Sequence, residues 1–314
     1  MVNLPGSEKI IKEYNLGEPV NFELLQSGKD NDVYSLIYSD GKKYVLRIAK
    51  RQEKDFVFEV ELLRALAETD FLAPKITLTR SGQSTVNLGE QQGSLFNYVE
   101  GRHFDKVNEE MLLDGTIEAG GRKLGHLHWV VQKMAVKENS RRTIFTELDR
   151  LLAVGVKKFK QFDGYESLLK EAKEFRTRGE QAAKKSAVGI IHNDYRIQNL
   201  IFIGQELCLI DFDWACHGPF LKDVGLALAE WSLFDPESGP SKEAVDQFLG
   251  GYNSAAPFRV DFNSDAIFWI CFACLSDACT FFADIIEGRY LNKQITDVNQ
   301  CHMYKKFEYF YKLL

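Results

Sequence analysis

Short segments in which hydrophobic and polar residues alternate fill the first hundred residues of the chain. This two-residue period is typical of β-strands with one buried face. The sequence Ser39-Asp40-Gly41-Lys42 joins two of these segments and is rich in turn-forming residues. An antiparallel sheet is therefore predicted here, with strands at residues 21–25, 33–38, 43–48, 75–79, 84–88 and 94–99.

From residue 108 onward the apolar residues recur at helical spacing over much longer stretches. Good helix formers dominate these stretches, and they also fill two shorter amphipathic segments near the beginning, residues 3–16 and 54–68. A further helix is predicted to start at Asp223. The second part of the chain is thus predicted to be mainly helical, with helices at residues 109–135, 143–154, 165–187, 241–253, 264–289 and 296–314.

One β-hairpin interrupts the predicted helices. Its apolar runs, residues 200–203 and 207–210, are separated by Gly204, Gln205 and Glu206, the length of a three-residue hairpin loop. Asn199 precedes the first run and Asp211 follows the second, so antiparallel pairing would bring them within about 5 Å. An amide oxygen beside a carboxylate is a hard-oxygen pair that suits Mg²⁺.

The loop before this hairpin completes the order of parts found in a kinase active site. His192, Asp194 and Asn199 have the spacing H-x-D-x-x-x-x-N, and after the hairpin Asp211 opens the sequence D-F-D. A single Asp-x4-Asn carries no information. The joint pattern, with its apolar hairpin, is specific.

These residues resemble the aminoglycoside phosphotransferase-like family of small-molecule kinases, which includes choline kinases and homoserine kinases. That family usually reads H-G-D-x-x-x-x-N, D-F-D or D-F-E, and then G-P-x-x-x-D, here Gly218, Pro219 and Asp223. Asn193 stands where glycine is usual. The resemblance implies an α+β, bilobal protein-kinase-like fold: an N-lobe antiparallel sheet with one helix at residues 1–100, and a mainly helical C-lobe at residues 101–314.

The resemblance also implies roles for the loop and hairpin residues. Asp194 would accept the proton of the acceptor hydroxyl, Asn199 and Asp211 would hold Mg²⁺, and Arg196 would reach the γ-phosphate of ATP or GTP. Asp213 is either a further metal ligand or an ordinary turn residue, and Asp223 either caps its helix or braces the catalytic loop. The predicted catalytic residues are Asp194, Asn199, Asp211, His192 and Arg196, and the predicted metal ligands are Asn199, Asp211 and Asp213.

Arg47 and Glu59 are the predicted charged pair of the N-lobe. Arg47 points away from Leu46 and Ile48 on its strand, and Glu59 lies on the inward side of the helix at residues 54–68. By resemblance, Glu59 would orient Arg47 on the α- and β-phosphates, where the family usually has lysine. Glu61 is the competing partner, and an exposed Arg47 on an edge strand is the alternative.

Two further segments are candidates for nucleotide contacts. The polar loop at residues 26–32 contains Gly28 and occupies the place of a nucleotide-covering loop, although an ordinary hairpin connection would look the same. By resemblance, the strand that ends near Glu100 joins the two lobes, and its residues Phe96, Asn97 and Tyr98 would meet the adenine edge.

Composition excludes several other classes of protein. The 314 residues carry a net charge of −6, which argues against nucleic-acid binding through a basic face. The N-terminus has no apolar leader, and the longest apolar run, residues 266–275, is short of the roughly 20 residues of a membrane helix, so we expect a cytoplasmic protein without a membrane partner. Six cysteines follow no disulfide framework. Cys271 and Cys274 are interpreted as core residues of a helix, and His126 and His128 as core or surface histidines, rather than as metal ligands.

The acceptor is predicted to be a small molecule with a hydroxyl group. Asp277 and Asp284 lie seven residues apart on one face of a predicted helix. They are candidates for binding an amine or hydroxyl of the acceptor, or else ordinary surface acids. The sequence at residues 248–253 and Trp231 resemble homoserine-kinase-type members of the family. A nucleotide-binding pseudokinase is the alternative function, favoured by Arg47 and Asn193. A Ser/Thr protein kinase is disfavoured because few residues separate Asp211 from Asp223.

Overall fold

The computed structural model describes residues 7–27, 31–50, 56–134, 136, 142–154, 156–234, 239–289 and 295–314. The chain divides into two compact units. The first comprises Met1–Gly101, Val136–Glu138 and Cys208–Asp213. The second comprises Arg102–Ala135, Asn139–Leu207 and Trp214–Leu314.

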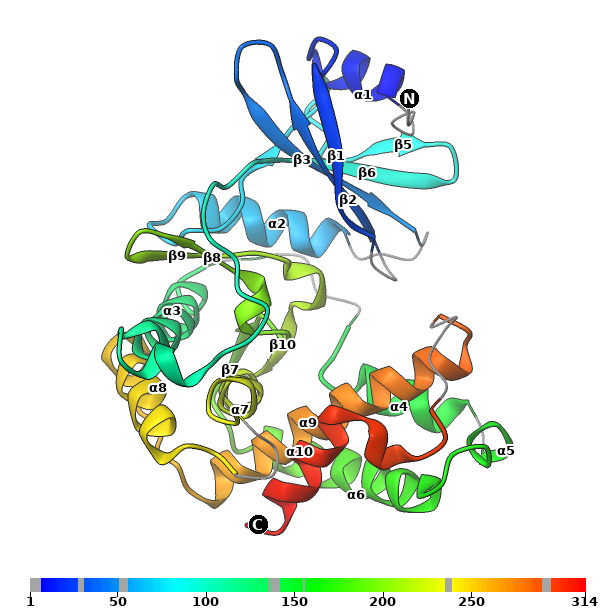
Figure 1. Cartoon of the computed structure of the whole chain (residues 1–314), viewed down its shortest axis with the longest axis vertical. Helices are drawn as coiled ribbons and strands as arrows, with labels where there is room; N and C mark the ends of the chain where they lie inside the picture. The colour runs from blue at the N-terminus through cyan, green and yellow to red at the C-terminus, as the bar shows by residue number, and fades with distance from the viewer. Residues whose placement is uncertain are drawn as a thin grey trace. The chain divides into compact units, whose positions relative to one another are not determined.

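The first unit is built on a six-stranded antiparallel sheet (Figure 1). Its main path runs β1-β2-β3-β6-β4, and β5 also pairs with β6. The predicted strands all occur, although β4 is short and β6 begins three residues earlier than expected. The strands are β1 (Asn21–Ser27), β2 (Asn31–Ile37), β3 (Lys43–Ala49), β4 (Ile76–Thr77), β5 (Val86–Leu88) and β6 (Gln91–Asn97).

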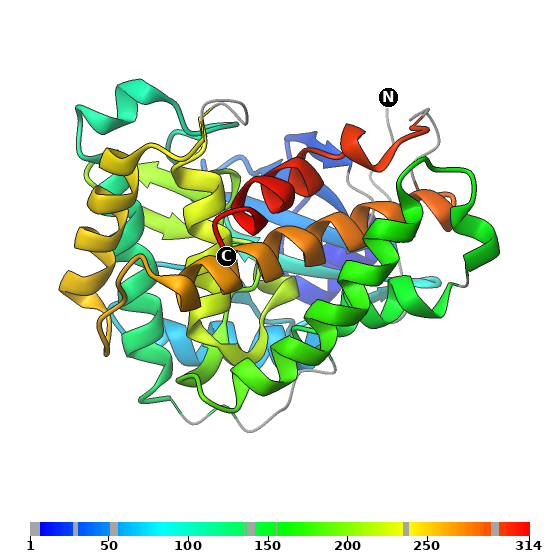
Figure 2. The same cartoon turned by 90° about the horizontal axis from the view of Figure 1, so that it is seen from below.

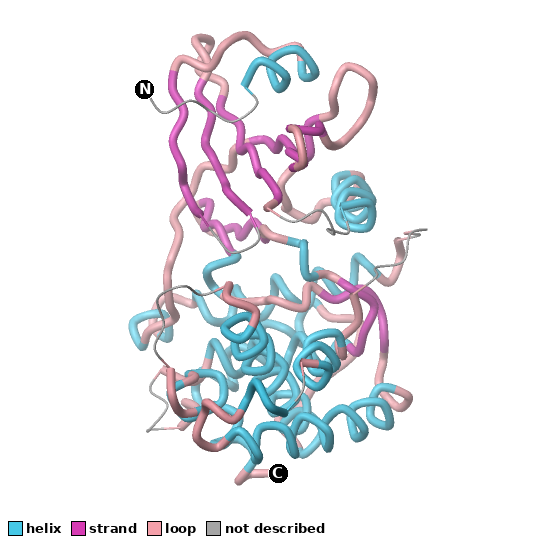
Figure 3. The backbone as a smooth tube through the Cα atoms, turned by 90° about the vertical axis from the view of Figure 1, so that its right-hand side faces the viewer, coloured by secondary structure: helices cyan, strands magenta, loops and turns pink. Residues whose placement is uncertain are grey.

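The apolar side chains of this sheet bury one of its faces. Leu46 and Ile48 of β3 and Leu36 of β2 belong to a buried cluster that also takes in Ile10 and Tyr14 of helix α1 (Ser7–Tyr14). Alternation along β3 sends Arg47 to the other face of the sheet. The second helix of this unit, α2 (Phe56–Ala67), contacts β4, and Figure 3 shows the helices and strands of the unit in a second view.

The second unit is mainly helical and is organised around its longest described helix, α9 (Ser264–Ile286). Helices α4, α6, α7 and α10 pack around α9 (Figure 2), and most of its side chains are buried. The other helices are α3 (Thr116–Val131), α4 (Thr146–Ala153), α5 (Val156–Phe159), α6 (Tyr165–Ala183), α7 (Phe220–Trp231), α8 (Lys242–Ala255), α10 (His302–Tyr311) and the short 3-10 helices η1 (Glu109–Leu112), η2 (Ile197–Asn199), η3 (Phe212–Trp214, at the boundary between the units) and η4 (Val298–Gln300).

Helices α3 and α8 approach each other closely enough to exclude side chains. A Cβ atom on Gly121 would lie 2.0 Å from the carbonyl oxygen of Phe248, and one on Gly251 would lie 2.0 Å from that of Glu118. Only glycine permits such an approach of two backbones. This contact positions His128 of α3 next to Tyr252 of α8.

The sequence-based prediction of the second unit was incomplete. The hairpin strands β8 (Leu200–Ile203) and β9 (Glu206–Leu209) are present, but the connecting loop is one residue shorter than predicted. A second two-stranded sheet, in which β7 (Val188–Ile191) pairs antiparallel with β10 (Cys216–Pro219), was missed. Four-residue strands that include Gly189 and Gly218 carry too little periodic signal to be recognised.

Two predicted helix boundaries were also wrong. The predicted helix at residues 109–135 is interrupted at Gly115, which has φ of 77°, so that η1 and α3 form separately. Helix α7 begins at Phe220, directly after Pro219, rather than at Asp223. Asp223 therefore lies within the first turn and is not the capping residue.

Helix α9 has the length and composition of a membrane-spanning helix, and it is the one helix in the described ranges that does. However, 83% of its apolar window is buried inside the protein. All six cysteines are buried, and Cys271 and Cys274 are core residues of α9.

Candidate active site

The loop that follows β7 holds an unusual backbone conformation at Asn193. Its φ is 66°, in the left-handed region that glycine adopts easily and asparagine tolerates better than most residues. This explains how asparagine stands at a position where glycine is usual. Two consecutive backbone N–H groups, of His192 and Asn193, donate to the two carboxylate oxygens of Asp223, each at 2.7 Å.

Asp194 presents a partly exposed carboxylate at this loop. The side-chain amide of Asn199 donates to the Asp194 carbonyl oxygen at 2.8 Å and to its Oδ2 at 2.9 Å, and Arg196 Nε lies 2.7 Å from Oδ1. About a quarter of the Asp194 side chain (24%) is exposed. Burial raises the pKa of Asp194 and Asp277 adds to this, while Arg196 opposes it. A carboxylate held in place, reachable and more basic than usual is suited to accept a proton.

Arg196 bridges the catalytic loop to helix α9. Its Nη2 lies 2.9 Å from Asp277 Oδ2, so Arg196, which was predicted to reach a phosphate, is engaged with two carboxylates. Asp277, a predicted acceptor ligand, thus lies beside the loop. Asp284 is different: it is fully buried and pairs with Arg150 at 2.5 Å and Arg289 at 3.0 Å. Both interpretations of Asp284, acceptor ligand and surface acid, were wrong.

Asp223 lies beneath the loop in a buried polar cluster. His128 Nε2 lies 3.3 Å from Asp223 Oδ2, and His128 Nδ1 lies 2.8 Å from the hydroxyl oxygen of Tyr252. Burial by itself would raise the pKa of Asp223, but the contact with His128 and the charge of Lys222 hold it below its ordinary value. The suggestion that Asp223 braces the catalytic loop agrees with these contacts.

His192 contributes its backbone rather than its ring to this arrangement. Its side chain is completely buried, and its ring lies edge-on to Tyr195, with 6.4 Å between the centroids. The imidazole of His192 therefore does not face solvent, where an acceptor would arrive.

In the first unit, Arg47 and Glu59 form the predicted pair. Two bonds of 2.8 and 2.5 Å join the guanidinium to the carboxylate, and both side chains are almost fully buried. Glu61 is not the partner in this pair, and the alternative of an exposed edge-strand arginine was wrong because β3 lies between β2 and β6. Burial alone would lower the pKa of Arg47, but the carboxylates of Glu59, Asp213 and Asp211 raise it above its ordinary value.

The two predicted aspartate ligands after β9 lie close to Arg47 within the same unit. Asp211 has φ of 64°, and its Oδ1 lies 3.7 Å from Arg47 Nη1 with 43% of its side chain exposed. Asp213 accepts a hydrogen bond of 3.3 Å from the side chain of Asn31. Sequence reasoning missed Asn31, for which the start of β2 gave no separate signal.

The other predicted nucleotide contacts have mixed outcomes. Gly28 lies outside the described residues. Phe96 is buried in β6 with the Arg47 guanidinium 5.1 Å from its ring centroid. The N–H groups of Asn97 and Tyr98 already donate to the carbonyl oxygens of Lys75 and Lys43. An adenine edge meeting this segment would have to use groups other than these two donors.

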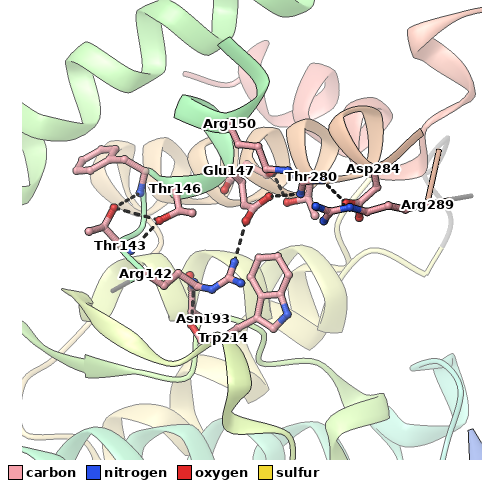
Figure 4. A network of polar contacts seen from close by, with 12 residues as sticks. Arg142, Thr143, Thr146, Glu147, Arg150, Asn193, Trp214, Thr280, Asp284 and Arg289 are labelled. Carbon is pink, nitrogen blue, oxygen red and sulfur yellow. Dashed lines mark hydrogen bonds and ion pairs between the residues drawn. The ribbon is translucent and has the colours of Figure 1, made fainter. Parts of the chain in front are cut away.

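Sequence reasoning also missed a polar network that joins the catalytic loop to α4 and α9 (Figure 4). The side-chain amide of Asn193 donates to the Trp214 carbonyl oxygen at 3.1 Å, and the Arg142 guanidinium lies 3.9 Å from the centroid of the Trp214 ring. Arg142 in turn donates to Glu147 at 2.7 Å. No local pattern marks the contacts of Trp214 with Asn193 and Arg142, because they join segments that are far apart in the sequence.

The structure thus gathers the predicted residues in two groups. Asp194, Asn199 and Arg196 lie together in the second unit, where Asp223 and Asp277 join them. Arg47, Glu59, Asp211 and Asp213 lie together in the first unit.

Comparison with known proteins identifies relatives of this chain. The model of a family described as "Phosphotransferase enzyme family" matches residues 21–260. A homoserine kinase from Nitrobacter winogradskyi is 25% identical over 246 residues, which cover 77% of this chain and 73% of that protein. The predicted family resemblance is confirmed by these matches.

Solved structures share the fold. An amicoumacin kinase in complex with AMP-PNP, Ca²⁺ and its ligand has a TM-score of 0.74 at 18% identity, covering 97% of this chain and 92% of that one. The choline kinase from Streptococcus pneumoniae has a TM-score of 0.69 at 14% identity, covering 98% and 96%. The predicted α+β, protein-kinase-like fold class is confirmed.

Proposed function

This chain belongs to the phosphotransferase enzyme family, and we propose that it transfers the γ-phosphoryl group of ATP to a hydroxyl group of a small, amine-bearing acceptor. The observation that carries the proposal is the environment of Asp194. Its carboxylate is fixed by Asn199 and Arg196, is partly exposed, and has a raised pKa. Among acceptors, homoserine is the first to test, because a homoserine kinase is similar to most of the chain.

Asp194 would orient the acceptor hydroxyl and take its proton late in the transfer. Phosphoryl transfer passes through a loose transition state, so the protein contributes mainly placement and charge neutralisation. The bonds from Asn199 restrict the rotation of the Asp194 side chain. This placement holds one carboxylate oxygen for the hydroxyl without a further ordering step.

A divalent cation fits the donors available. Asn199 uses its amide N–H groups on Asp194, which leaves its side-chain oxygen as the atom for a metal. We propose that the carboxylates of Asp211 and Asp213 would supply further hard oxygens, which Mg²⁺ prefers. The described part of the chain contains no group of three His, Cys, Asp or Glu side chains that could hold a metal ion by itself, and phosphates and water would complete the shell. Mg²⁺ would neutralise phosphate charge during transfer.

Arg47 would contact the α- and β-phosphates. Glu59 fixes the guanidinium through two bonds, and a planar fork held this way offers its remaining N–H groups in a fixed direction. We assign ATP as the nucleotide.

Asp277 is the group that we assign to the amine of the acceptor. It lies beside Arg196 at the catalytic loop with 29% of its side chain exposed, and an ammonium group would share this carboxylate with Arg196.

We place the reaction in the cytoplasm, in line with the burial of α9 inside the protein.

A direct assay tests the proposal. The purified protein is incubated with ATP and Mg²⁺ and with homoserine, choline, an aminoglycoside or a thioribose analogue, and both ATP consumption and phosphorylated product are measured. We expect Mg²⁺-dependent product with an amine-bearing acceptor, and none when the metal is chelated. Nucleotide binding without product from any acceptor would instead support a pseudokinase, and label on polypeptide would indicate a protein kinase.

A further inference from the structure

Three consecutive peptide groups of the catalytic loop are held by two adjacent side chains of α7. Asp223 accepts from the N–H groups of His192 and Asn193. Its neighbour Lys222 donates from Nζ to the carbonyl oxygen of Asn193 at 3.0 Å. That carbonyl belongs to the peptide group that joins Asn193 to Asp194, so the third contact fixes the peptide plane from which Asp194 extends.

Lys222 lies in an unusual environment for a lysine. Only 4% of the residue is exposed, and its hydrogen bond goes to a neutral carbonyl oxygen. Burial of an ammonium group is costly unless it is compensated, and burial lowers the pKa of Lys222, which the charge of Asp223 opposes. A buried lysine at this position is therefore expected to have a role that an apolar side chain could not fill, namely donating a hydrogen bond to the loop.

Asn193 needs such a contact more than an ordinary residue does. Its left-handed backbone conformation is disfavoured for residues other than glycine, and strained conformations persist only where the surroundings fix them. The side chain of Asn193 is also bound, to the Trp214 carbonyl oxygen. The backbone N–H, the backbone carbonyl and the side-chain NH₂ group of Asn193 thus each have a partner within the second unit.

We propose that Lys222 is a positioning residue of the phosphotransferase: together with Asp223 it clamps the turn at Asn193 and so sets the direction in which the Asp194 carboxylate points. The proposal rests on the proposed function of Asp194. Proton acceptance requires the carboxylate oxygen within hydrogen-bond reach of the hydroxyl, and a displacement of about 1 Å costs on the order of 100-fold in rate.

The test uses Lys222→Met, which keeps an unbranched chain of similar length but removes the donor. We expect kcat to fall by about 10- to 100-fold, with one nucleotide still bound per chain by calorimetry. Loss of folded enzyme would instead lower the bound nucleotide in step with kcat. In hydrogen exchange, the peptide that spans residues 188–199 should exchange faster than in the parent protein.

Lys242→Met is the matched control, because Lys242 lies on the surface of α8 with 89% of its side chain exposed, and it should leave both measurements unchanged. Unchanged exchange at residues 188–199 in Lys222→Met, or a kcat within about twofold of the parent value, would overturn the clamp. Should that variant fail to fold, Lys222→Leu, which also lacks the donor, is judged by the same criteria. If the parent protein phosphorylates no acceptor, the proposed function fails, while the exchange measurement still decides whether Lys222 holds the loop.

Discussion

Asp194, on the loop after β7, and Asp223, in the first turn of α7, both make hydrogen bonds at this loop but lie in opposite environments. Asp223 is fully buried, receives two backbone N–H bonds and contacts His128, and its pKa is lowered. Asp194 is partly exposed, receives an amide bond and an arginine contact, and its pKa is raised. Environments that separate the pKa values of two carboxyl groups also separate their roles.

The comparison shows that hydrogen-bond donors and neighbouring charges, more than burial alone, decide whether the pKa of each aspartate is lowered or raised. Desolvation acts on both groups in the same direction. For Asp223, the contact with the buried His128 and the charge of Lys222 outweigh desolvation. For Asp194, Asp277 adds a second negative charge nearby, which raises the pKa further. Asp223 is thereby held as a structural anion, and Asp194 is the aspartate that we propose as the base.

The largest effect is expected from Asp194→Asn. Asparagine keeps the shape of the side chain but accepts no proton, so kcat should fall by about 10²- to 10⁴-fold. The dissociation constant for nucleotide, measured by calorimetry, should stay the same. Product formation at the parent rate would remove Asp194 from the role of base and end the contrast with Asp223.

Asp223→Asn should act chiefly on stability. The amide keeps one acceptor for two backbone donors and removes the charge beside Lys222, and breaking such a buried arrangement costs about 3–5 kcal/mol of unfolding free energy. Urea unfolding measures this. Asp261→Asn, at an exposed ion pair with Arg259, should change stability by less than about 0.5 kcal/mol. Equal losses in the two variants would contradict the role of Asp223 as brace.

The smallest expected effect is on the pH dependence of stability through His128. Burial lowers the pKa of His128 from its ordinary value of 6.5, although Asp223 opposes this. As the pH falls through 6.5, the unfolded chain takes up a proton that the folded protein does not, so stability present above pH 6.5 declines by up to about 1.4 kcal/mol per pH unit. Asp223 adds a similar loss only at lower pH, since its lowered pKa lies below the ordinary 3.8.

His128→Gln, which keeps polar contacts for Asp223 and Tyr252 but does not titrate, should flatten the decline below pH 6.5. Thermal unfolding at a series of pH values measures both proteins. A parallel decline in the variant would show that another group controls this pH range.

Much of the site was predictable because many of its residues occur at characteristic spacings within short stretches of the sequence. The spacing of His192, Asp194 and Asn199, the apolar hairpin and the D-F-D sequence lie within two dozen residues, and strand alternation in β3 separated Arg47 from Leu46 and Ile48. The pairing of Arg47 with Glu59 was predicted from the inward position of Glu59 on its helix together with the family resemblance. The β7–β10 sheet escaped prediction because its strands are short and paired across 24 intervening residues.

The sequence by itself determined most of the elements and the type of the polar side chains in the loop after β7, because these depend on periodicity and spacing along the chain. Only the tertiary structure decided which charges meet. Arg196 donates to Asp277, which lies 81 residues away in the sequence, and Asp223 accepts from the backbone N–H of His192, which lies 31 residues away. The physical reason is that a buried charge takes its partner from whatever helix packing brings within hydrogen-bond distance, and no local period encodes that choice.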